Sequence, residues 1–575
     1  MAKDNIEMAV EPQPQIEEPS GLEAGQKEVT PTIDAQTGVQ KIEAVTLAWS
    51  RTSLFIALGL IWLLTLVNGF KSTILISLVP YITSDWYSHS LLTVIGIVAN
   101  AITAAVYIPM AKVLDVWGRA EGFLIMTVFC ILGLILMASA KNLSTYCAAE
   151  VFYSIGFSGL GYTWDVLATD VTNLRNRGLA FAFTSSPAII TAFAGSRAAE
   201  AFVNNVSWRW GVGCWAIVLP FVAGPMYALL KYHQNKARKT GIIVIEKGEK
   251  WTLKSVVTYL VEDVDLIGVF MFAAGLTIFL LPFTLAASAP HGWKTGYIIA
   301  MIVVGFVLLA CFGLYEGFVA KKPFLDGRYL TDRTVMGACL LDFIYQISYY
   351  CYALYFTSFL QVVYNVDVAG AGYIANTFSA VSFVFLFIAG YLIRVTGRFK
   401  WLLYVCVPLY IFALGLMIHF RTPNGYIGYV VMCEIFFSVA GSIFILVVQL
   451  AVLAAVDHQH VAAVLALLFV TGTVGDAVGG AVSGVIWTNT FEKALIRFLP
   501  ESALPDLASI YGSLPVQLSY APGTPERLGI QLAYGYTQTR MLAAGTAIMV
   551  VGFAATALMR NLNVKTMTQT RGNVL

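Results

Sequence analysis

Six side chains in one apolar segment, residues 334–361, recur at helical spacing and could together form a binding surface. They are Asp342, Tyr345, Tyr349, Tyr352, Phe356 and Phe359. Because they are three or four residues apart, they lie on one stripe of a helix, about 100° wide. Flat rings with hydroxyl groups suit a bulky ligand that needs both stacking and hydrogen bonds. Packing against a neighbouring helix is an equally good interpretation. Gln361 and Tyr162 are two further candidates for contact with a ligand.

Seven ionisable side chains lie inside apolar segments, where a charge is costly and a functional role is the default interpretation. They are Lys71, Glu150, Asp165, Arg197, Asp342, Glu434 and Asp476. A carboxyl group in such surroundings can load and release a proton. Asp165, Glu150 and Asp476 are the first choices for carrying protons. The alternative is a set of structural ion pairs, such as Lys71 with one of the acids, or Arg197 with Glu200.

Metal ligands do not converge in this sequence. The six histidines are scattered, and only His458 and His460 are close together. A carrier of bare iron or zinc needs several His, Cys or carboxylate groups around one point. The sequence also contains no P-loop, zinc-protease motif or nucleophile elbow. We therefore expect no bound metal, no cofactor and no enzymatic activity.

Composition defines the elements that must hold these side chains. The chain has 575 residues, of which 58% are hydrophobic and 12% are charged, whereas soluble domains carry about 25% charged residues. This excludes a soluble enzyme. A transmembrane helix needs about 20 apolar residues, so the sequence predicts an all-α polytopic membrane protein with about fourteen spans. The expected spans are 53–83, 90–111, 122–140, 144–169, 178–200, 210–230, 264–287, 295–318, 334–361, 371–393, 400–420, 426–450, 461–487 and 541–560.

The distribution of Lys and Arg predicts the orientation in the membrane. These residues are concentrated in the connections on the side of the N-terminus, which predicts that both termini are cytosolic. Glycosylation sequons at Asn142 and Asn205 fall on the opposite side, in agreement with this orientation. A net charge of +2 provides no basic field for nucleic acid. The expected surroundings are therefore the lipid bilayer and not a polynucleotide.

The spans and connections predict six regions. The connection at 488–539 has no obvious secondary structure and is expected to act either as a lid over the outer mouth or as a passive linker. The expected regions are a disordered tail (1–50), a six-helix bundle (51–232), a cytosolic loop with an interfacial helix (233–263, the helix at 249–262), two inserted helices (264–320), a second six-helix bundle that includes the outer loop 488–539 (321–560), and a cytosolic tail (561–575).

Two sequence motifs occur once in each bundle. The connection after the second span contains Ala111, Asp115, Gly118 and Arg119, and the connection after the tenth contains Gly390, Arg394, Gly397 and Arg398 at the same spacing. Two spans later, Glu150-Val-Phe-Tyr-Ser-Ile is echoed by Glu434-Ile-Phe-Phe-Ser-Val at nearly the same offset. The bundles are therefore interpreted as two copies of one six-helix unit. Parallel repeats with a substrate path between them are typical of secondary transporters.

The repeated connection has a clear physical purpose. Gly or Ala at the small positions allows close helix approach and a tight turn, and Asp115 and Arg119 can bridge neighbouring helix ends. Arg394 stands where the first copy has an acid, so the second copy cannot make the same bridge. A solvated tight turn is the alternative interpretation. This pattern resembles the major facilitator superfamily, which implies a major facilitator fold.

Longer stretches resemble the fungal siderophore-iron transporters, a fourteen-span group of that superfamily. Asp476 departs from the small neutral residue expected at its position. The resemblance implies a ferric siderophore as substrate, whose own oxygen atoms ligate the iron, so that the protein needs no metal ligands. The stretches are Asp115-Val-Trp-Gly-Arg-Ala-Glu-Gly122, Val264-Asp-Leu-Ile-Gly-Val-Phe270, Leu281-Pro-Phe-Thr-Leu285, Tyr355-Phe-Thr-Ser-Phe-Leu-Gln-Val-Val363, His458-Gln-His-Val461 and Ile486-Trp-Thr-Asn-Thr490.

The sequence thus favours a monomeric symporter that imports a ferric siderophore together with protons, in the plasma membrane or an endosomal membrane. One alternative is an antiporter that exports drugs or other bulky organic solutes. Such antiporters usually carry Gly-Pro-x-x-Gly-Gly in the fifth span, which this chain lacks at 184–195. A second alternative is a nutrient receptor that binds its ligand on the same fold without transporting it.

Overall fold

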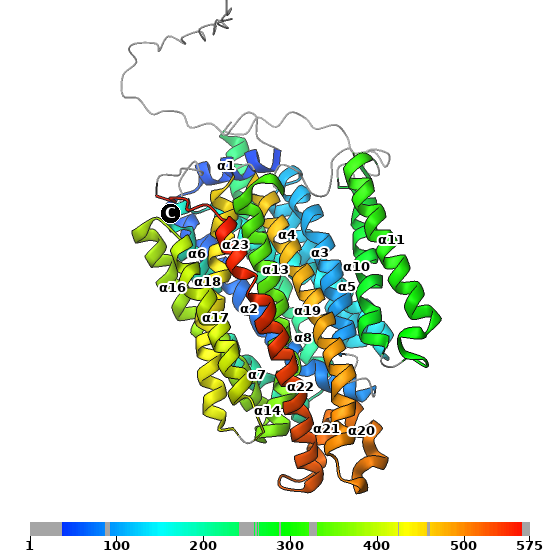
Figure 1. Cartoon of the computed structure of the whole chain (residues 1–575). Coiled ribbons are helices and arrows are strands. Elements are labelled where there is room, and N and C mark those ends of the chain that lie inside the picture. The colour runs from blue at the N-terminus through cyan, green and yellow to red at the C-terminus, as the bar shows by residue number, and fades with distance from the viewer. Residues whose placement is uncertain are drawn as a thin grey trace, which may run out of the picture.

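The computed structural model describes residues 37–86, 92–240, 258, 261–262, 264–286, 289–320, 330–423, 425–456 and 460–565. Every regular element within these ranges is a helix. The helices stand side by side in one bundle, with α10 and α11 as a hairpin on its flank (Figure 1). Most of the expected tail, most of the interfacial helix expected at 249–262, His458 and the C-terminal residues 566–575 lie outside the described residues.

The first half of the bundle follows the chain from the N-terminal side. Its helices are α1 (Thr37–Ala48), α2 (Arg51–Asp85), α3 (Leu92–Val116), α4 (Arg119–Ser139), α5 (Leu143–Asp170), α6 (Leu174–Ser185), α7 (Ala188–Asn205) and α8 (Trp208–Lys239). The hairpin consists of α10 (Leu266–Leu285), the short η4 (Gly292–Lys294) and α11 (Gly296–Phe318).

The second half of the bundle follows the hairpin. Its helices are α13 (Arg333–Ala353), α14 (Phe356–Tyr364), α15 (Val368–Ala375), α16 (Thr377–Thr396), α17 (Lys400–Phe420), α18 (Ile427–Ala454), α19 (Val461–Phe498), η6 (Glu501–Asp506), α20 (Leu507–Gly512), α21 (Leu514–Ser519), α22 (Pro525–Met549) and α23 (Gly552–Leu558).

Twelve helices in the described part of the chain are long and apolar enough to cross a membrane. The expectation of about fourteen spans is therefore met for twelve. The expected spans at 144–169 and 334–361 form α5 and α13, which are rich in Tyr, Ser, Thr and acidic residues and are not among the twelve. Both pack in the interior of the bundle, where a helix does not need an apolar surface toward lipid.

Four of the expected spans are broken into two helices, including 541–560, where α22 ends at Met549 and α23 begins at Gly552. Pro187 separates α6 from α7, because proline lacks the N–H group that would continue the helix. Asn376 separates α15 from α16. Between α13 and α14, Tyr355 has a left-handed backbone with φ of 60°. Breaks of this kind place backbone polar groups and bends inside the bundle.

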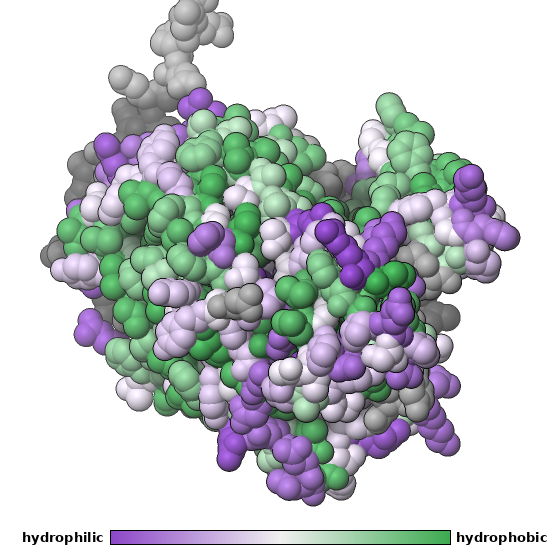
Figure 2. Space-filling model, turned by 60° about the horizontal axis from the view of Figure 1, so that its bottom comes forward, coloured by the Kyte–Doolittle hydropathy of each residue, from purple (hydrophilic) through white to green (hydrophobic). Residues whose placement is uncertain are grey.

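The expected long outer loop at 488–539 is mostly helical, so that prediction of an unstructured connection was wrong. Helix α19 continues to Phe498 and α22 already begins at Pro525, which leaves only 499–524 for η6, α20 and α21. Buried Phe491 and Leu495 continue the helical apolar face of α19 beyond the membrane-length segment. Polar side chains gather at this end of the molecule, and apolar ones cover its flanks (Figure 2).

The last part of the expected disordered tail also differs from prediction, because residues 37–48 form α1. Figure 1 shows α1 lying across the end of the bundle opposite α20 and α21. Ile42, Val45 and the following Trp49 are buried at spacings of three and four residues. This apolar side gives α1 a surface to pack with, which a solvated tail would not have.

Candidate functional site

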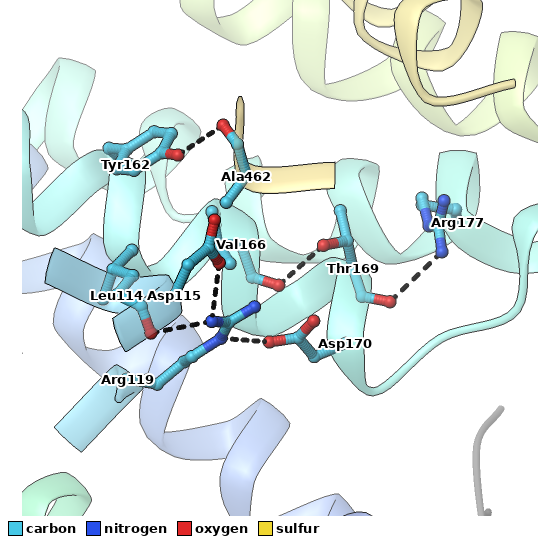
Figure 3. Close-up of polar contacts among 9 residues, drawn as sticks. All are labelled: Leu114, Asp115, Arg119, Tyr162, Val166, Thr169, Asp170, Arg177 and Ala462. Atoms are coloured by element: carbon cyan, nitrogen blue, oxygen red, sulfur yellow. Dashed lines mark hydrogen bonds and ion pairs between the residues drawn. The ribbon is translucent and has the colours of Figure 1, made fainter. Parts of the chain in front are cut away.

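Arg119 is the centre of a buried ionic network at the end of the first half that lies next to α1 (Figure 3). Its Nη1 lies 3.0 Å from Asp115 Oδ1, and its Nε lies 3.0 Å from Asp170 Oδ2. Nη1 also donates to the Leu114 carbonyl at 2.8 Å. The bridge expected between Asp115 and Arg119 is therefore present. Asp170, at the end of α5, completes the network and was not among the expected residues, because its partner is distant in sequence.

The turn that carries Arg119 is also held by α1. Gly118 has φ of 116°, a conformation suited to glycine. Lys41 Nζ donates a 2.8 Å hydrogen bond to the carbonyl of Trp117. Burial lowers the pKa of Lys41, and Glu121 opposes this effect. Glu121 itself pairs with Lys231 of α8. The first motif copy is thus fixed to α1, α5 and α8 together.

The second motif copy has no equivalent network within the described residues. Arg394 and Arg398 are exposed, in keeping with the loss of the acidic residue. Gly390 instead provides a close helix crossing, because a Cβ atom placed there would lie 3.0 Å from the backbone carbon of Gly178. Gly397 turns the chain with φ of 74°. Ala111, which occupies the corresponding position in the first motif copy, is buried as well.

Contacts between the two halves occur at several depths. Toward the end of the bundle that carries α1, the Tyr162 hydroxyl donates a 2.6 Å hydrogen bond to the Ala462 carbonyl, as Figure 3 shows. The Phe469 ring lies 5.4 Å from that of Tyr107, centroid to centroid. Nearer the opposite end of the bundle, Asn100 Nδ2 donates to the Tyr350 hydroxyl at 3.2 Å.

Gln361 is also at this interface. Its Oε1 accepts a 3.4 Å hydrogen bond from Tyr81 of α2. Nearby contacts join α7 to α15, where Asn376 Nδ2 donates to Ser196 Oγ at 3.2 Å. Of the two extra candidates for ligand contact, Tyr162 therefore lies between the halves toward the α1 end of the bundle, and Gln361 lies between them toward the opposite end.

The aromatic stripe continues from α13 into α14, but much of it faces the second half. Tyr345, Tyr352, Phe356 and Phe359 are almost fully buried, and only Tyr349 is half-buried. The Tyr349 ring stacks at 6.2 Å on Phe437 of α18. The packing interpretation therefore describes four of these rings.

Three candidate acids lie close to the interface between the halves. Asp342 packs against the backbone of α19 at Gly472, where a Cβ would lie 2.3 Å from Asp342 Oδ2. Asp476 is within electrostatic range of Asp342 and of Tyr107. Asp165 is also within range of Tyr107, which joins the three acids into one region. None of the three has a basic partner among the ion pairs of the described residues.

Lys71 is buried inside the first half, yet it does not pair with an acid of the described residues. Its Nζ lies 3.1 Å from Cys130 Sγ. The rings of Tyr153 and Phe157 face the ammonium group at 5.0 and 5.1 Å. The alternative of an ion pair with one of the candidate acids is thus not realised. Glu150 accepts a 3.4 Å hydrogen bond from Ser154.

Two other expectations concern the periphery. Arg197 is largely exposed and pairs with Glu200, which is the structural alternative considered for it. Asn142 is exposed and caps α5 by accepting from the Thr145 N–H at 2.8 Å. Asn205 is exposed at the end of α7. Both sequons are therefore on the surface.

Arg421 was not among the site residues expected from the sequence. It is fully buried at the end of α17 and lies between α13, α14 and α18. Its Nη1 donates to the Tyr352 carbonyl at 3.0 Å. The hydroxyl of Tyr352 in turn donates to Glu434 Oε1 at 2.6 Å. The position of Arg421 directly after an apolar span was the available signal.

Within the described residues the chain is a bundle of membrane-length helices whose first and second halves contact each other. Comparisons with known proteins identify its class. The family model described as Major Facilitator Superfamily matches residues 61–341. A solved structure of the peptide transporter POT in complex with sulfate covers 91% of this chain and 99% of its own, with a TM-score of 0.52 and 12% identity. A bacterial homologue of the human lysosomal transporter Spinster, in an inward-facing and occupied conformation, gives a TM-score of 0.51 at 14% identity and covers 89% of this chain and 97% of its own.

Relatives with much higher identity define the group. The MFS siderochrome iron transporter B of Aspergillus fumigatus is 63% identical over 97% of this chain and 90% of its own length. The siderophore iron transporter mirB of Emericella nidulans is 58% identical over 99% of this chain and 96% of its own. The chain belongs to the fungal siderochrome iron transporters of the major facilitator superfamily. It is a multi-pass membrane protein of a transporter family and not an enzyme.

Proposed function

We propose that this protein imports ferric siderophore complexes by alternating access, in symport with protons. The observation that carries the substrate class is the 63% identity to a siderochrome iron transporter over 97% of the chain. In the alternating-access cycle, contacts at the inner and outer ends of the two halves open in turn while the substrate stays between them. The end of the bundle that carries α1 is the cytosolic end, and the membrane is the plasma membrane or an endosomal membrane.

The residues between the halves support this mechanism. Tyr107 of α3 and Tyr350 of α13 are half-buried next to α19, and half-buried Tyr349 faces Phe378 of α16 and Phe437 of α18. Their rings and hydroxyl groups offer stacking and hydrogen bonds to a bulky chelate that already ligates its own iron. The iron is therefore cargo and requires no ligand from the protein.

Proton coupling rests on the acids without basic partners. Asp476 and Asp342 interact through their like charges, which disfavours a state with both ionised. Such a pair can exchange a proton as its surroundings change during the cycle. Asp165 and Glu150 are the other candidates, each half-buried on α5 of the first half.

The test is uptake of radiolabelled iron, supplied as several purified ferric siderophores, by yeast that lacks its own carriers and expresses this chain. We expect saturable accumulation of at least one complex, abolished by a protonophore. Asp476→Asn should lose the accumulation, and Glu492→Gln, on an exposed position of the outer part of α19, should keep it. Normal surface expression without uptake of any complex would contradict the proposal for that set.

Binding without accumulation would instead favour a receptor. That outcome is distinguished by measuring label retained on cells at low temperature and label inside cells after warming. A transporter moves the label inside, whereas a receptor leaves it at the surface.

A further inference from the structure

The break between α13 and α14 is the starting point. Helix α13 ends at Ala353, and Tyr355 adopts a left-handed backbone before α14 begins. A non-glycine residue in that region is strained unless its surroundings hold it there. Here the Tyr355 ring stacks on Trp487 of α19 at 3.8 Å, nearly parallel. The joint between α13 and α14 is therefore a defined bend and is held from α19.

The end of α13 also leaves backbone carbonyls without helical partners. Arg421 Nη1 donates to the Tyr352 carbonyl at 3.0 Å, and Gln538 Nε2 donates to the Leu354 carbonyl at 3.4 Å. A positive group at this position also complements the negative end of the helix dipole. Arg421 thus caps α13 although it comes from α17.

The same guanidinium contacts the beginning of α14. Its carbon atom lies 4.2 Å from the ring centroid of Phe356 and 4.9 Å from that of Phe359. Cation–π contacts of this kind are stronger where water is excluded. Arg421 therefore contacts both sides of the break, through a carbonyl on α13 and through two rings on α14.

Tyr352 connects this cap to an acid. Its carbonyl accepts from Arg421, and its hydroxyl donates to Glu434 Oε1 at 2.6 Å. Arg421 Nε and Nη2 and Glu434 Oε2 have no hydrogen-bond partner in the described part of the chain. The two charged groups interact electrostatically but do not form an ion pair there. These two donors of Arg421 and this acceptor of Glu434 are thus available for a second hydrogen-bonding arrangement of the two side chains.

The first half lacks this arrangement. Glu150, which matches Glu434 in the repeat, accepts a 3.4 Å hydrogen bond from Ser154. The charge that follows α4 is Lys141, which is exposed. A hydrogen-bonded link from a buried cation through a tyrosine to an acid is therefore present in the second half, whereas in the first half Lys71 faces the ring of Tyr153 and donates to Cys130.

We infer that Arg421 is a positioning residue that couples the protonation of Glu434 to the orientation of α14, and so to opening of the outer end. Charged Glu434 attracts Arg421 and orders Tyr352, which holds the bend. A protonated Glu434 loses this attraction, and α14 with its two rings is then free to move. The groups that face Glu434 are Tyr352 and Tyr349 of α13 and Arg421. This inference rests on the proposed proton-coupled transport.

Hydrogen exchange of residues 355–364 in the purified protein tests the structural part without any substrate. Arg421→Gln and Glu434→Gln should each raise exchange there by about tenfold or more, because charge-assisted hydrogen bonds are lost. Arg421→Lys keeps the charge but not the planar fork, so it should give a smaller increase and serves if the first variant does not fold. Arg540→Gln, an exposed arginine on α22, is the matched control and should leave exchange unchanged.

The functional part is tested by comparing net uptake with exchange of internal and external siderophore. Glu434→Gln should lose protonophore-sensitive accumulation while retaining siderophore exchange across the membrane. Arg421→Lys should raise the KM for the siderophore more than it lowers kcat. Unchanged hydrogen exchange in Arg421→Gln, or wild-type accumulation in Glu434→Gln, would overturn the inference. Absence of transport by the wild-type chain would overturn the proposed function instead, whatever the hydrogen exchange shows.

Discussion

The hydroxyl of Tyr162 donates a 2.6 Å hydrogen bond to the carbonyl of Ala462, which joins the inner part of α5 to the first turn of α19. These helices belong to different halves of the molecule. In an alternating-access cycle this bond must break whenever the inner end opens, so its strength affects how often that end is open.

Replacing Tyr162 with Phe should therefore favour opening of the inner end. Loss of one buried hydrogen bond costs about 1 kcal/mol, which shifts the equilibrium about fivefold. Hydrogen exchange of residues 461–467 should rise accordingly. Tyr350→Phe, which removes the contact with Asn100 near the outer end, should leave exchange in this segment unchanged. Equal effects of both variants on 461–467 would argue against a separate inner contact.

The ionic network predicts a large difference between the two motif copies. Arg119→Ala leaves Asp115 and Asp170 buried without their cation, which should destabilise the protein by about 3 to 5 kcal/mol. Arg398→Ala removes an exposed side chain and should change stability by less than about 0.5 kcal/mol. Thermal unfolding in detergent compares the two. Similar melting temperatures for both variants would contradict a structural role for the network.

The crossing of α6 and α16 leaves no space for a side chain at Gly390. Gly390→Ala places a methyl group 3.0 Å from the Gly178 backbone, so the helices must separate. Destabilising a closed state of the cycle by about 1.4 kcal/mol lowers its population about tenfold. We therefore expect uptake to fall at least about tenfold. Gly415→Ala meets no atom within 4 Å and should retain uptake. Full uptake by Gly390→Ala at normal surface expression would disprove the need for this contact.

Helix α1 should depend on Lys41 for its position. Lys41→Met removes the hydrogen bond to the Trp117 carbonyl but keeps an apolar side chain of similar length. Exchange of the α1 backbone should increase about fivefold, as expected for about 1 kcal/mol. Lys239→Met, on an exposed position at the end of α8, provides the comparison. An unchanged α1 in Lys41→Met would mean that Ile42, Val45 and Trp49 alone hold the helix.

Much of the fold could be predicted because apolar segments and a repeated motif depend on local sequence. The pairing of Asp115 with Arg119 is local too, since four residues separate them on the chain. Asp170 and Arg421 could not be assigned in this way, because their partners come from other helices and only packing brings them together. The helical outer connection was missed because its apolar positions, such as Phe491, are separated by charged ones.

The aromatic stripe shows a second limit. Spacing placed Tyr345 and Phe359 on one face of the segment but did not show which neighbour that face meets. In the structure they contact Tyr410 and Tyr534 of the second half. Tyr350, outside the stripe, makes the contact with the first half. Choosing between packing and binding required the positions of the surrounding helices.

The most direct test of the central claim is ferric siderophore uptake by the purified protein in sealed liposomes with an imposed proton gradient. We predict that an inwardly directed gradient, acid outside, drives accumulation above the external concentration, and that collapsing the gradient returns the internal concentration to equilibrium. Asp476→Asn should equilibrate the substrate without accumulating it. Uptake that reaches the same level with and without the gradient would contradict proton symport.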